Sequence, residues 1–373
     1  MTRLTADHVV ELARSWFPEA ADNPHTMLGV LRKRTPAFVP AWLSALDVTG
    51  VALRPEHHAE LATARDRVTT MRALTEALVA KFPEAQPLKG VAVVDRYPAG
   101  VVRTMNDVDV VVPDIRTLWT LAEWLRDELG LTIVKALSAF GADDGGPVGL
   151  LLSLEAPPVH PLAQRVNVEI TTHAWLGDAG AVRPRRTLPG DGFGLPEQLL
   201  MIVAERLEGP FGLKDVLDGA VLQRELSAAE SERLVASAAE LGVLPHLAEL
   251  RRHITEHGLG PDLPTPRPRR TVLGRGVAQV ARGPLVAALR HLQRAEAFPG
   301  PFAGQRRWMW RAVESVLPTA APLRRRLWAY GVPVTGTAPE VLRTPFGSFL
   351  MVGSAAVGEH WLRVPGVDFE VAQ

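Results

Sequence analysis

Residues 103–112 have the sequence Arg103-Thr104-Met105-Asn106-Asp107-Val108-Asp109-Val110-Val111-Val112. In an extended strand, residues two apart point to the same side. Asp107 and Asp109 are therefore expected on one face, with Val108 and Val110 packing into a core. Two carboxylates this close repel each other unless a cation lies between them, and a hard divalent ion such as Mg²⁺ or Mn²⁺ suits such oxygen ligands. The alternative is the solvated start of an ordinary strand, because a single Asp-x-Asp pattern is a weak signal.

A second predicted strand supplies a third acid. Residues 165–171 alternate, with Val168 and Ile170 on one side and Glu169 on the other. Glu169 is therefore predicted to face the same cleft as Asp107 and Asp109. Three carboxylates on two strands are the arrangement used by two-metal phosphoryl or nucleotidyl transfer. We expect all three acids to be catalytic and to bind metal, with Glu169 as the base that accepts the proton of the incoming hydroxyl.

These two strands belong to a predicted α/β core over residues 86–195. One clear helix is expected at Ile115–Leu129. Short β-type runs surround it, at Leu88–Val94, Val108–Val112, Leu131–Ser138, Val148–Leu154 and Arg165–Ile170. The predicted fold class is accordingly α+β, with a mixed sheet flanked by helices.

Helical patterns precede and follow this core. Residues 1–85 are predicted as a helical lead-in with two or three helices between Thr5 and Lys81, where Thr5 or Asp7 is the first N-cap and Glu56–Ala80 is a long segment. Residues 196–260 are predicted as a helical subdomain that completes the cleft. Its expected helices are Glu197–Leu207, Leu213–Glu225, Ser227–Leu241 and Pro245–His257.

The C-terminal part of the chain has a different composition. Residues 261–270 contain four prolines between 261 and 268 and are predicted as a linker. Residues 271–373 form an Arg-rich C-terminal region, with helices expected around 285–297 and 308–313 and strand-like runs within 344–371. Residues 251–330 hold 15 Arg and four acidic residues. An anionic partner at 267–326 would explain this charge, and solvated helix faces would explain it equally well.

Composition excludes several classes of protein. The 373 residues suggest two or three structural units, and 47% hydrophobic residues are enough for a buried core. The absence of cysteine excludes disulfides, thiolate nucleophiles and cysteine-type zinc sites. No run of the sequence resembles a signal peptide or a transmembrane segment, so a cytoplasmic location is expected.

Lys89 and Gly90 form a further candidate binding element. They lie in Gln86-Pro87-Leu88-Lys89-Gly90-Val91, where glycine permits close backbone approach and the amides beside it can face an anion. Lys89 adds a mobile positive charge. The alternative is a surface lysine before an ordinary turn.

The ordered set Leu88-Lys89-Gly90, Tyr97-Pro98, Arg103 and Asn106 to Pro113 resembles the signature of the uncharacterised nucleotidyltransferase family, within the polymerase β-like nucleotidyltransferase superfamily. The resemblance covers roughly residues 25–260. It implies a nucleotidyltransferase-like sheet core, with Asp107 and Asp109 as the metal-binding pair and Glu169 as the third acid. It also implies nucleotide binding by Lys89, Gly90, Arg103 and Asn106.

The chain departs from this family pattern at two places. Asn106 stands where Gly or Ser is commoner, which a turn tolerates because Asn also adopts left-handed backbone angles. His173 and Trp175 follow Glu169 at a stretched spacing, so no role is assigned to His173.

Lys214 and Asp218 are four residues apart on the predicted helix Leu213–Glu225. Similar Lys-Asp-x-x-Asp helices occur in related nucleotidyltransferases, where they help to hold the nucleotide. The resemblance thus implies a nucleotide-binding role for both residues. The alternative is an ordinary i,i+4 ion pair.

The sequence therefore favours an enzyme that transfers a nucleotidyl group from an NTP to a hydroxyl or phosphate of an acceptor, which is a small molecule, a peptide or RNA. Glycosyl transfer from a nucleotide-sugar to a peptide or small molecule is an alternative, because Asp-x-Asp pairs serve that reaction too. A non-catalytic binding protein on the same fold is a second alternative.

Overall fold

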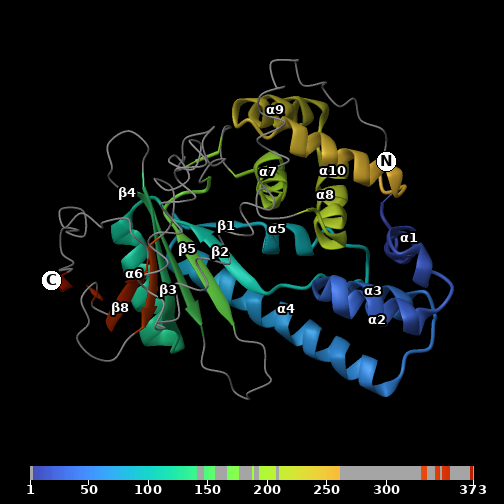
Figure 1. Cartoon of the computed structure of the whole chain (residues 1–373), viewed down its shortest axis with the longest axis horizontal. Helices are drawn as coiled ribbons and strands as arrows, with labels where there is room; N and C mark the ends of the chain where they lie inside the picture. The colour runs from blue at the N-terminus through green and yellow to red at the C-terminus, as the bar shows by residue number, and fades with distance from the viewer. Residues whose placement is uncertain are drawn as a thin grey trace, which may run out of the picture. The chain divides into compact units, whose positions relative to one another are not determined.

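The protein has an α+β fold of many helices and a mixed β-sheet (Figure 1). The computed structural model describes residues 3–140, 147–155, 166–175, 187–188, 193–206, 210–260, 329–333, 341–344, 347–352 and 370–372. The chain divides into two compact units. The first contains Met1–Lys81, Pro87–Val108 and Leu188–Thr271, and the second contains Phe82–Gln86, Asp109–Thr187 and Val272–Gln373.

The first unit begins with helices α1 (Ala6–Trp16), α2 (Pro24–Arg34), α3 (Val39–Val48) and α4 (Pro55–Lys81). Thr5 is the N-cap of α1, as predicted, and Asn23 caps α2 by accepting hydrogen bonds from the backbone of His25 and Thr26. The long helix predicted at Glu56–Ala80 is confirmed as α4. The lead-in and the helical subdomain predicted from sequence fall in the same compact unit.

The four α-helices of this lead-in exceed the two or three that the sequence predicts. Pro24 and Pro55 are the first residues of α2 and α4. Proline is well suited to the first turn of a helix, because the N–H that it lacks has no partner there. Prolines in this segment therefore begin separate helices as well as interrupting longer ones.

The secondary structure predicted from sequence is wrong for one segment of the first unit. A strand was expected at Leu88–Val94, but β1 (Gln86–Leu88) ends at Leu88 and the short helix α5 (Gly90–Val94) follows directly. The chain turns at Lys89, whose φ is +48° and ψ is −96°. An apolar run this short has no periodicity that separates a strand from one helical turn.

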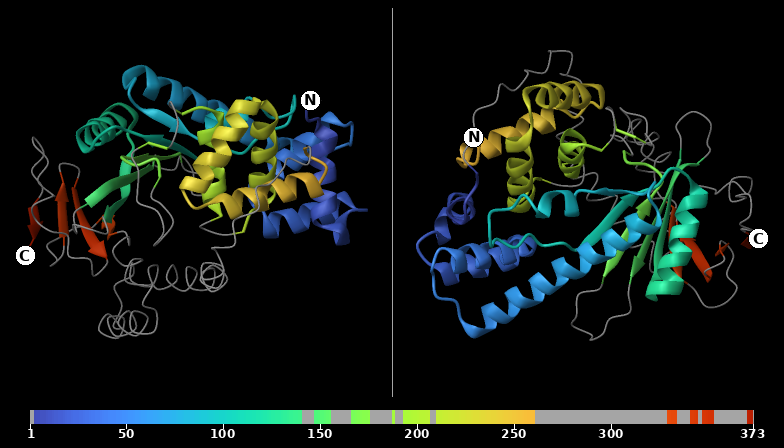
Figure 2. Two further views of the ribbon diagram at one scale, coloured as in Figure 1. Left: turned by 90° about the horizontal axis from the view of Figure 1, so that it is seen from above. Right: turned by 180° about the vertical axis from the view of Figure 1, so that it is seen from behind.

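Four more helices complete the first unit. They are α7 (Leu195–Glu205), α8 (Leu213–Glu225), α9 (Ala228–Glu240) and α10 (Leu244–Glu256). All four were predicted, with α8 at the same bounds. They pack on one another, as Figure 2 shows, and α8 also contacts α1 and α5. Their buried side chains place the core of this unit around α8, whose residues Val216 to Gln223 are all buried.

The second unit is built on the sheet. It includes β2 (Asp107–Val111) from Asp109 onward, α6 (Ile115–Leu129), β3 (Thr132–Phe140), β4 (Pro147–Glu155) and β5 (Asn167–Thr171). Strands β6 (Ala329–Pro333), β7 (Val341–Thr344), β8 (Gly347–Val352) and β9 (Glu370–Ala372) follow. The described strands have the order β1-β2-β5-β4-β3-β6-β8-β7-β9, and α6 packs on β3, β4 and β5 (Figure 1).

Helix α6 has the bounds predicted from sequence, and its ends explain why. Asp114 caps its first turn by accepting a hydrogen bond from the backbone N–H of Thr117, and Gly130 ends it at a φ of +66°. The apolar side of α6, with Leu118, Leu121 and Leu125, is fully buried.

The linker predicted at 261–270 and the basic helices predicted around 285–297 and 308–313 lie outside the described residues. Within the described part of the chain, every helix is too short or too polar to cross a bilayer.

Candidate functional site

The acid-bearing strands have the alternation that their sequences predict. On β2, Val108 and Val110 are buried while Asp107 and Asp109 are half-buried. On β5, Val168 and Ile170 are fully buried, and Glu169 is half-buried. The acids therefore occupy the more open side of each strand.

Strands β2 and β5 are neighbours in the sheet. The backbone N–H of Val112 donates to the carbonyl oxygen of Thr171 at 2.8 Å. This bond joins the carboxyl ends of the two strands, so we infer that they run parallel. In a parallel pair the residue opposite Val112 is then Thr172, which places Asp109 opposite Glu169. Each of these two acids has an interaction partner in the structure.

Carboxylate oxygens are the ligands that Mg²⁺ and Mn²⁺ prefer, so the donor chemistry of these strands fits a hard cation. Among the described residues there is no group of three or more His, Cys, Asp or Glu side chains arranged to hold a metal ion. Mg²⁺ in nucleotide sites is commonly held by one or two carboxylates together with substrate phosphates.

Arg67, on α4, supports the chain just before the acid pair. Its Nε donates to the carbonyl oxygen of Met105 at 2.7 Å, and its Nη2 donates to that of Asn106 at 2.6 Å. Burial lowers the pKa of Arg67, and the nearby charge of Asp107 opposes this effect. Asn106 was predicted at the nucleotide, and the structure shows its carbonyl engaged by Arg67.

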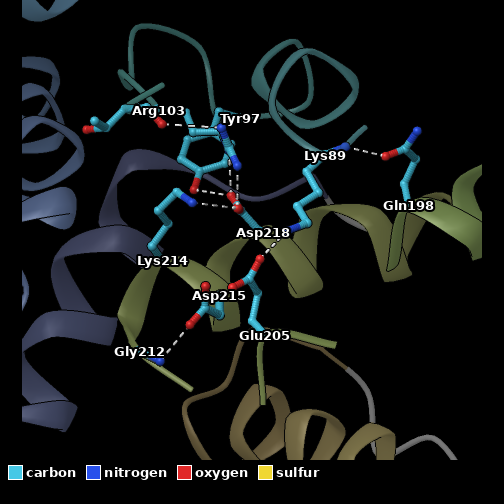
Figure 3. Close-up of polar contacts among 10 residues, drawn as sticks. Lys89, Tyr97, Arg103, Gln198, Glu205, Gly212, Lys214, Asp215 and Asp218 are labelled. Atoms are coloured by element: carbon cyan, nitrogen blue, oxygen red, sulfur yellow. Dashed lines mark hydrogen bonds and ion pairs between the residues drawn. The ribbon is translucent and has the colours of Figure 1, made fainter. Parts of the chain in front are cut away.

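A second cluster forms in the first unit around Asp218, on α8 (Figure 3). Arg103 donates two hydrogen bonds to its carboxylate, from Nε at 2.8 Å and from Nη2 at 2.7 Å. The hydroxyl of Tyr97 donates to the same carboxylate at 2.6 Å. Arg103 and Asp218 are only 3% and 2% exposed, so this pair is inside the protein.

Burial and charge act in opposite directions on these groups. Burial alone would raise the pKa of Asp218, but the charges of Arg103 and Lys214 and the hydrogen bonds from Arg103 and Tyr97 outweigh it, so the pKa is lowered. Burial and the adjacent Asp218 charge raise the pKa of Tyr97 well above its usual value. The cluster is therefore a neutral tyrosine bound to an ion pair at physiological pH.

Lys214 approaches the cluster from the first turn of α8. Its Nζ lies 3.8 Å from Asp218 Oδ2, which is the i,i+4 ion pair that the sequence left open as the alternative to phosphate binding. The Lys214 side chain is 30% exposed, so the ammonium group is still open to solvent. Next to it, the Asp215 carboxylate accepts a hydrogen bond from the Gly212 N–H at 2.8 Å, and burial raises its pKa.

Lys89 is bound at two points by helix α7. Its backbone N–H donates to Gln198 Oε1 at 2.5 Å, and its ammonium group pairs with Glu205 (Figure 3). Gly90 follows at the start of α5, where a Cβ would lie 3.1 Å from Met105 Cε. The glycine predicted to allow close backbone approach is therefore closely packed, against a methionine side chain.

The structure thus divides the predicted site residues between the two units. Lys89, Gly90, Arg103, Asn106, Asp107, Lys214 and Asp218 lie in the first unit, and Asp109 and Glu169 lie in the second. Within the first unit, Arg103 and Lys214 both pair with Asp218. Nucleotide binding and metal binding by these residues stay predictions.

Four residues that form hydrogen bonds or ion pairs with the predicted site residues, or with the chain beside them, were not predicted from sequence. They are Arg67, Tyr97, Gln198 and Glu205. Tyr97 was visible as part of the Tyr-Pro element of the resemblance, and its partner Asp218 was also singled out. The other three carry no motif, because two of them bind backbone groups and Glu205 binds a residue 116 positions away.

Comparison with protein-family models, with curated proteins and with solved structures gives no match to this chain.

Proposed function

We propose that the protein is a nucleotidyltransferase that uses Mg²⁺ or Mn²⁺ and transfers a nucleoside monophosphate from an NTP to a hydroxyl or phosphate of an acceptor. The proposal is supported by the adjacency of strands β2 and β5, whose register, as inferred above from the bond between Val112 and Thr171, puts Asp109 opposite Glu169, with Asp107 two residues earlier on β2. Carboxylates that alternate with fully buried valine and isoleucine are held on a well-packed scaffold, and on this proposal they would supply oxygen ligands to the ion.

In the proposed reaction, the acceptor oxygen attacks the α-phosphorus of the NTP. A new phosphorus–oxygen bond forms to the acceptor, the bond to the β-phosphate oxygen breaks, and pyrophosphate leaves. Glu169 accepts the proton of the acceptor hydroxyl. Asp107 and Asp109 would hold the divalent ion, which when bound neutralises phosphate charge and stabilises the leaving oxygen.

The cations of the first unit divide into two kinds by exposure. Lys89 and Lys214 are partly exposed, at 23% and 30%, and each pairs with a carboxylate. Arg103 and Asp218 are buried and bind each other. We assign phosphate contact to the lysines and a positioning role to the buried pair, since removing Arg103 from Asp218 to reach a ligand would leave a buried charge unpaired.

The test measures pyrophosphate release and product mass with each NTP and Mg²⁺, in the presence of a cell extract as the source of acceptor. Asp109→Asn should lower activity by at least about 10²-fold and Glu169→Gln by about 10²- to 10⁴-fold, while both variants stay folded. Asp127→Asn is the matched control, because Asp127 is an exposed carboxylate on α6 with the same change of charge.

The product separates the proposal from its alternatives. A product heavier by a nucleoside monophosphate supports nucleotidyl transfer, and one heavier by a sugar, seen only with a nucleotide-sugar, replaces it by glycosyl transfer. Equal signal from the wild type, Asp109→Asn and Asp127→Asn would contradict the enzyme assignment.

A further inference from the structure

Helix α7 contacts both the backbone and the side chain of Lys89 (Figure 3). Gln198 and Glu205 are seven residues apart on this helix, which is two turns, so they lie on the same side. Gln198 binds the backbone of Lys89, and Glu205 pairs with its ammonium group. A lysine held at both ends by one helix has a fixed starting position, which an ordinary surface lysine lacks.

The backbone at Lys89 needs such support. Its φ of +48° and ψ of −96° belong to a conformation that glycine adopts readily and that side chains with a Cβ disfavour. Within the described residues Lys89 is the only non-glycine residue with a positive φ. Strained residues of this kind persist where surrounding contacts hold them, and they concentrate at binding sites.

The Gln198 side chain supplies those contacts with both ends of its amide. Its Oε1 accepts from the Lys89 N–H at 2.5 Å, and its Nε2 donates to the Pro87 carbonyl oxygen at 3.2 Å. The side chain is 4% exposed, so these bonds are shielded from water. The two bonds bracket Leu88 and fix the direction in which the chain leaves β1.

The ion pair between Lys89 and Glu205 is more exposed than the bonds of Gln198. The Glu205 side chain is 34% exposed, and that of Lys89 is 23% exposed. This ion pair is partly exposed to solvent, so it contributes less to the position of Lys89 than the buried bonds of Gln198 do. On the proposed function, a phosphate group beside Lys89 would compete with Glu205 for the ammonium group.

We propose that Gln198 is a positioning residue that fixes Lys89 in its positive-φ conformation, with Glu205 as the resting partner that the phosphates of an NTP displace. The phosphate part of this inference rests on the proposed function. The positioning part rests only on the contacts described above, so the two can fail separately.

The chain has only five lysines, Lys33, Lys81, Lys89, Lys135 and Lys214, which makes a direct test practical. Reductive methylation with ¹³C-formaldehyde keeps the lysine charge and gives a side-chain NMR signal for each lysine. The Lys89→Arg variant identifies the Lys89 signal. The signal is then recorded in the full-length wild type, in Gln198→Ala and in the matched control Gln223→Ala, which removes another buried glutamine from the first unit.

Without nucleotide, Gln198→Ala should move the Lys89 signal towards its position in urea-unfolded protein, and Gln223→Ala should leave it in place. An unchanged signal in Gln198→Ala, or an equal movement in Gln223→Ala, would overturn the positioning role.

The variant Gln198→Glu provides a second test within a single folded protein. Its new carboxyl group, when protonated, can still donate to Pro87 and accept from Lys89, whereas the ionised carboxylate loses the donor. Because burial disfavours the charged form, this group should titrate above the usual range for glutamate. Compared with the wild type at the same pH, the Lys89 signal should coincide with it at low pH and depart from it at high pH, where the bond to Pro87 is lost and a buried negative charge lies beside Lys89. A signal that is independent of this titration would contradict the positioning role, even where Gln198→Ala fails to fold.

Titration with ATP and the other NTPs tests the phosphate contact. The wild-type Lys89 signal should shift on binding, and Gln198→Ala should weaken the affinity roughly tenfold, which is the effect of misplacing one charged contact. If no NTP shifts the wild-type signal, the phosphate contact is wrong, and the nucleotide-free comparison still decides whether Gln198 positions Lys89.

Discussion

Arg103 and Asp218 face each other through two parallel hydrogen bonds of 2.8 and 2.7 Å, and both side chains are almost completely buried. Such a fork-to-fork pair is the strongest geometry open to an arginine and a carboxylate. Tyr97 completes it from a third direction. The pair joins the loop before β2 to helix α8, and it ties two candidate site residues into the core of the first unit.

Removing one partner of this pair should destabilise the protein strongly. Arg103→Met leaves the buried Asp218 carboxylate without its hydrogen-bonded cation and with only Lys214 3.8 Å away, and a loss of about 3–5 kcal/mol in the free energy of unfolding is expected. Urea denaturation followed by circular dichroism measures it. The control is Arg126→Met, which breaks the exposed pair with Asp127 and should leave stability almost unchanged. Equal losses from the two variants would show that the buried pair is not a stabilising contact.

The same pair predicts how stability depends on pH in acid. Because the pKa of Asp218 is lowered in the folded protein, its stabilising contribution is present above the unfolded value of about 3.9 and is lost as the pH falls through the lower, folded value. Asp218→Asn should therefore lose more stability at pH 6 than at pH 2. Thermal melts of both proteins at the two pH values measure this, and an equal difference in melting temperature at both would contradict it.

The backbone of Lys89 can be tested by comparing two substitutions at that position. Lys89→Gly and Lys89→Ala both remove the pair with Glu205, but only glycine relieves the strain of a positive φ. The glycine variant should be more stable than the alanine variant by about 1 kcal/mol. At Lys33, near the end of helix α2, the order should reverse, because alanine favours a helix and glycine does not. The same order at both positions would show that the backbone of Lys89 is not strained.

Arg67 should be needed for its shape as well as its charge. A lysine at this position reaches only one of the carbonyl groups of Met105 and Asn106, so Arg67→Lys should cost about 1–3 kcal/mol of stability. Urea denaturation measures this loss. Arg65→Lys is the control, since Arg65 makes an exposed pair with Asp47 at 3.6 Å. On the proposed function, Arg67→Lys should also slow nucleotide turnover, because it loosens the chain that leads to Asp107.

A group of aromatic rings predicts a second effect of pH. Trp16 of α1 lies 5.3 Å from the His253 ring and 4.9 Å from the His257 ring, measured between centroids. Burial lowers the pKa of both histidines, with a further contribution to His253 from Arg252 and to His257 from His253. A lowered histidine pKa stabilises the fold above about pH 6.5, and this contribution is lost as the pH falls towards the folded value.

The double variant His253→Gln and His257→Gln should therefore show a smaller fall in melting temperature between pH 7.5 and pH 5.5 than the wild type. His58→Gln, on the exposed part of α4, should keep the wild-type fall. If the double variant falls as much as the wild type, the ring group does not contribute to this pH dependence.

Much of the local structure could be predicted, because the signals that determine it are local. Helices α6 and α8 have the predicted bounds because Asp114, Gly130 and Gly212 mark their ends in the sequence. The alternation on β2 and β5 was predicted for the same reason, since its period is visible within five residues. The strand predicted at Leu88–Val94 was wrong because the turn at Lys89 occurs at a residue type that gives no turn signal.

The candidate site could be predicted only in part. The acids on β2 and β5 follow from local patterns. The remaining contacts join residues that are far apart in the sequence. Gln198 binds Lys89 across 109 residues, Arg67 binds Met105 across 38, and Arg103 pairs with Asp218 across 115. Two of these three contacts use backbone groups, which every residue carries, so no side-chain pattern in the sequence marks them.

The separation between Arg103 and Asp218 also affects the order of events during synthesis. The nascent chain exposes Arg103 when its carboxylate partner is still 115 residues from being made. At about 5–20 residues per second, the ribosome needs roughly 6 to 23 s to supply it. During that interval the guanidinium and the apolar residues around it have no finished core to enter, so this stretch of the emerging polypeptide is where a chaperone would be expected to bind.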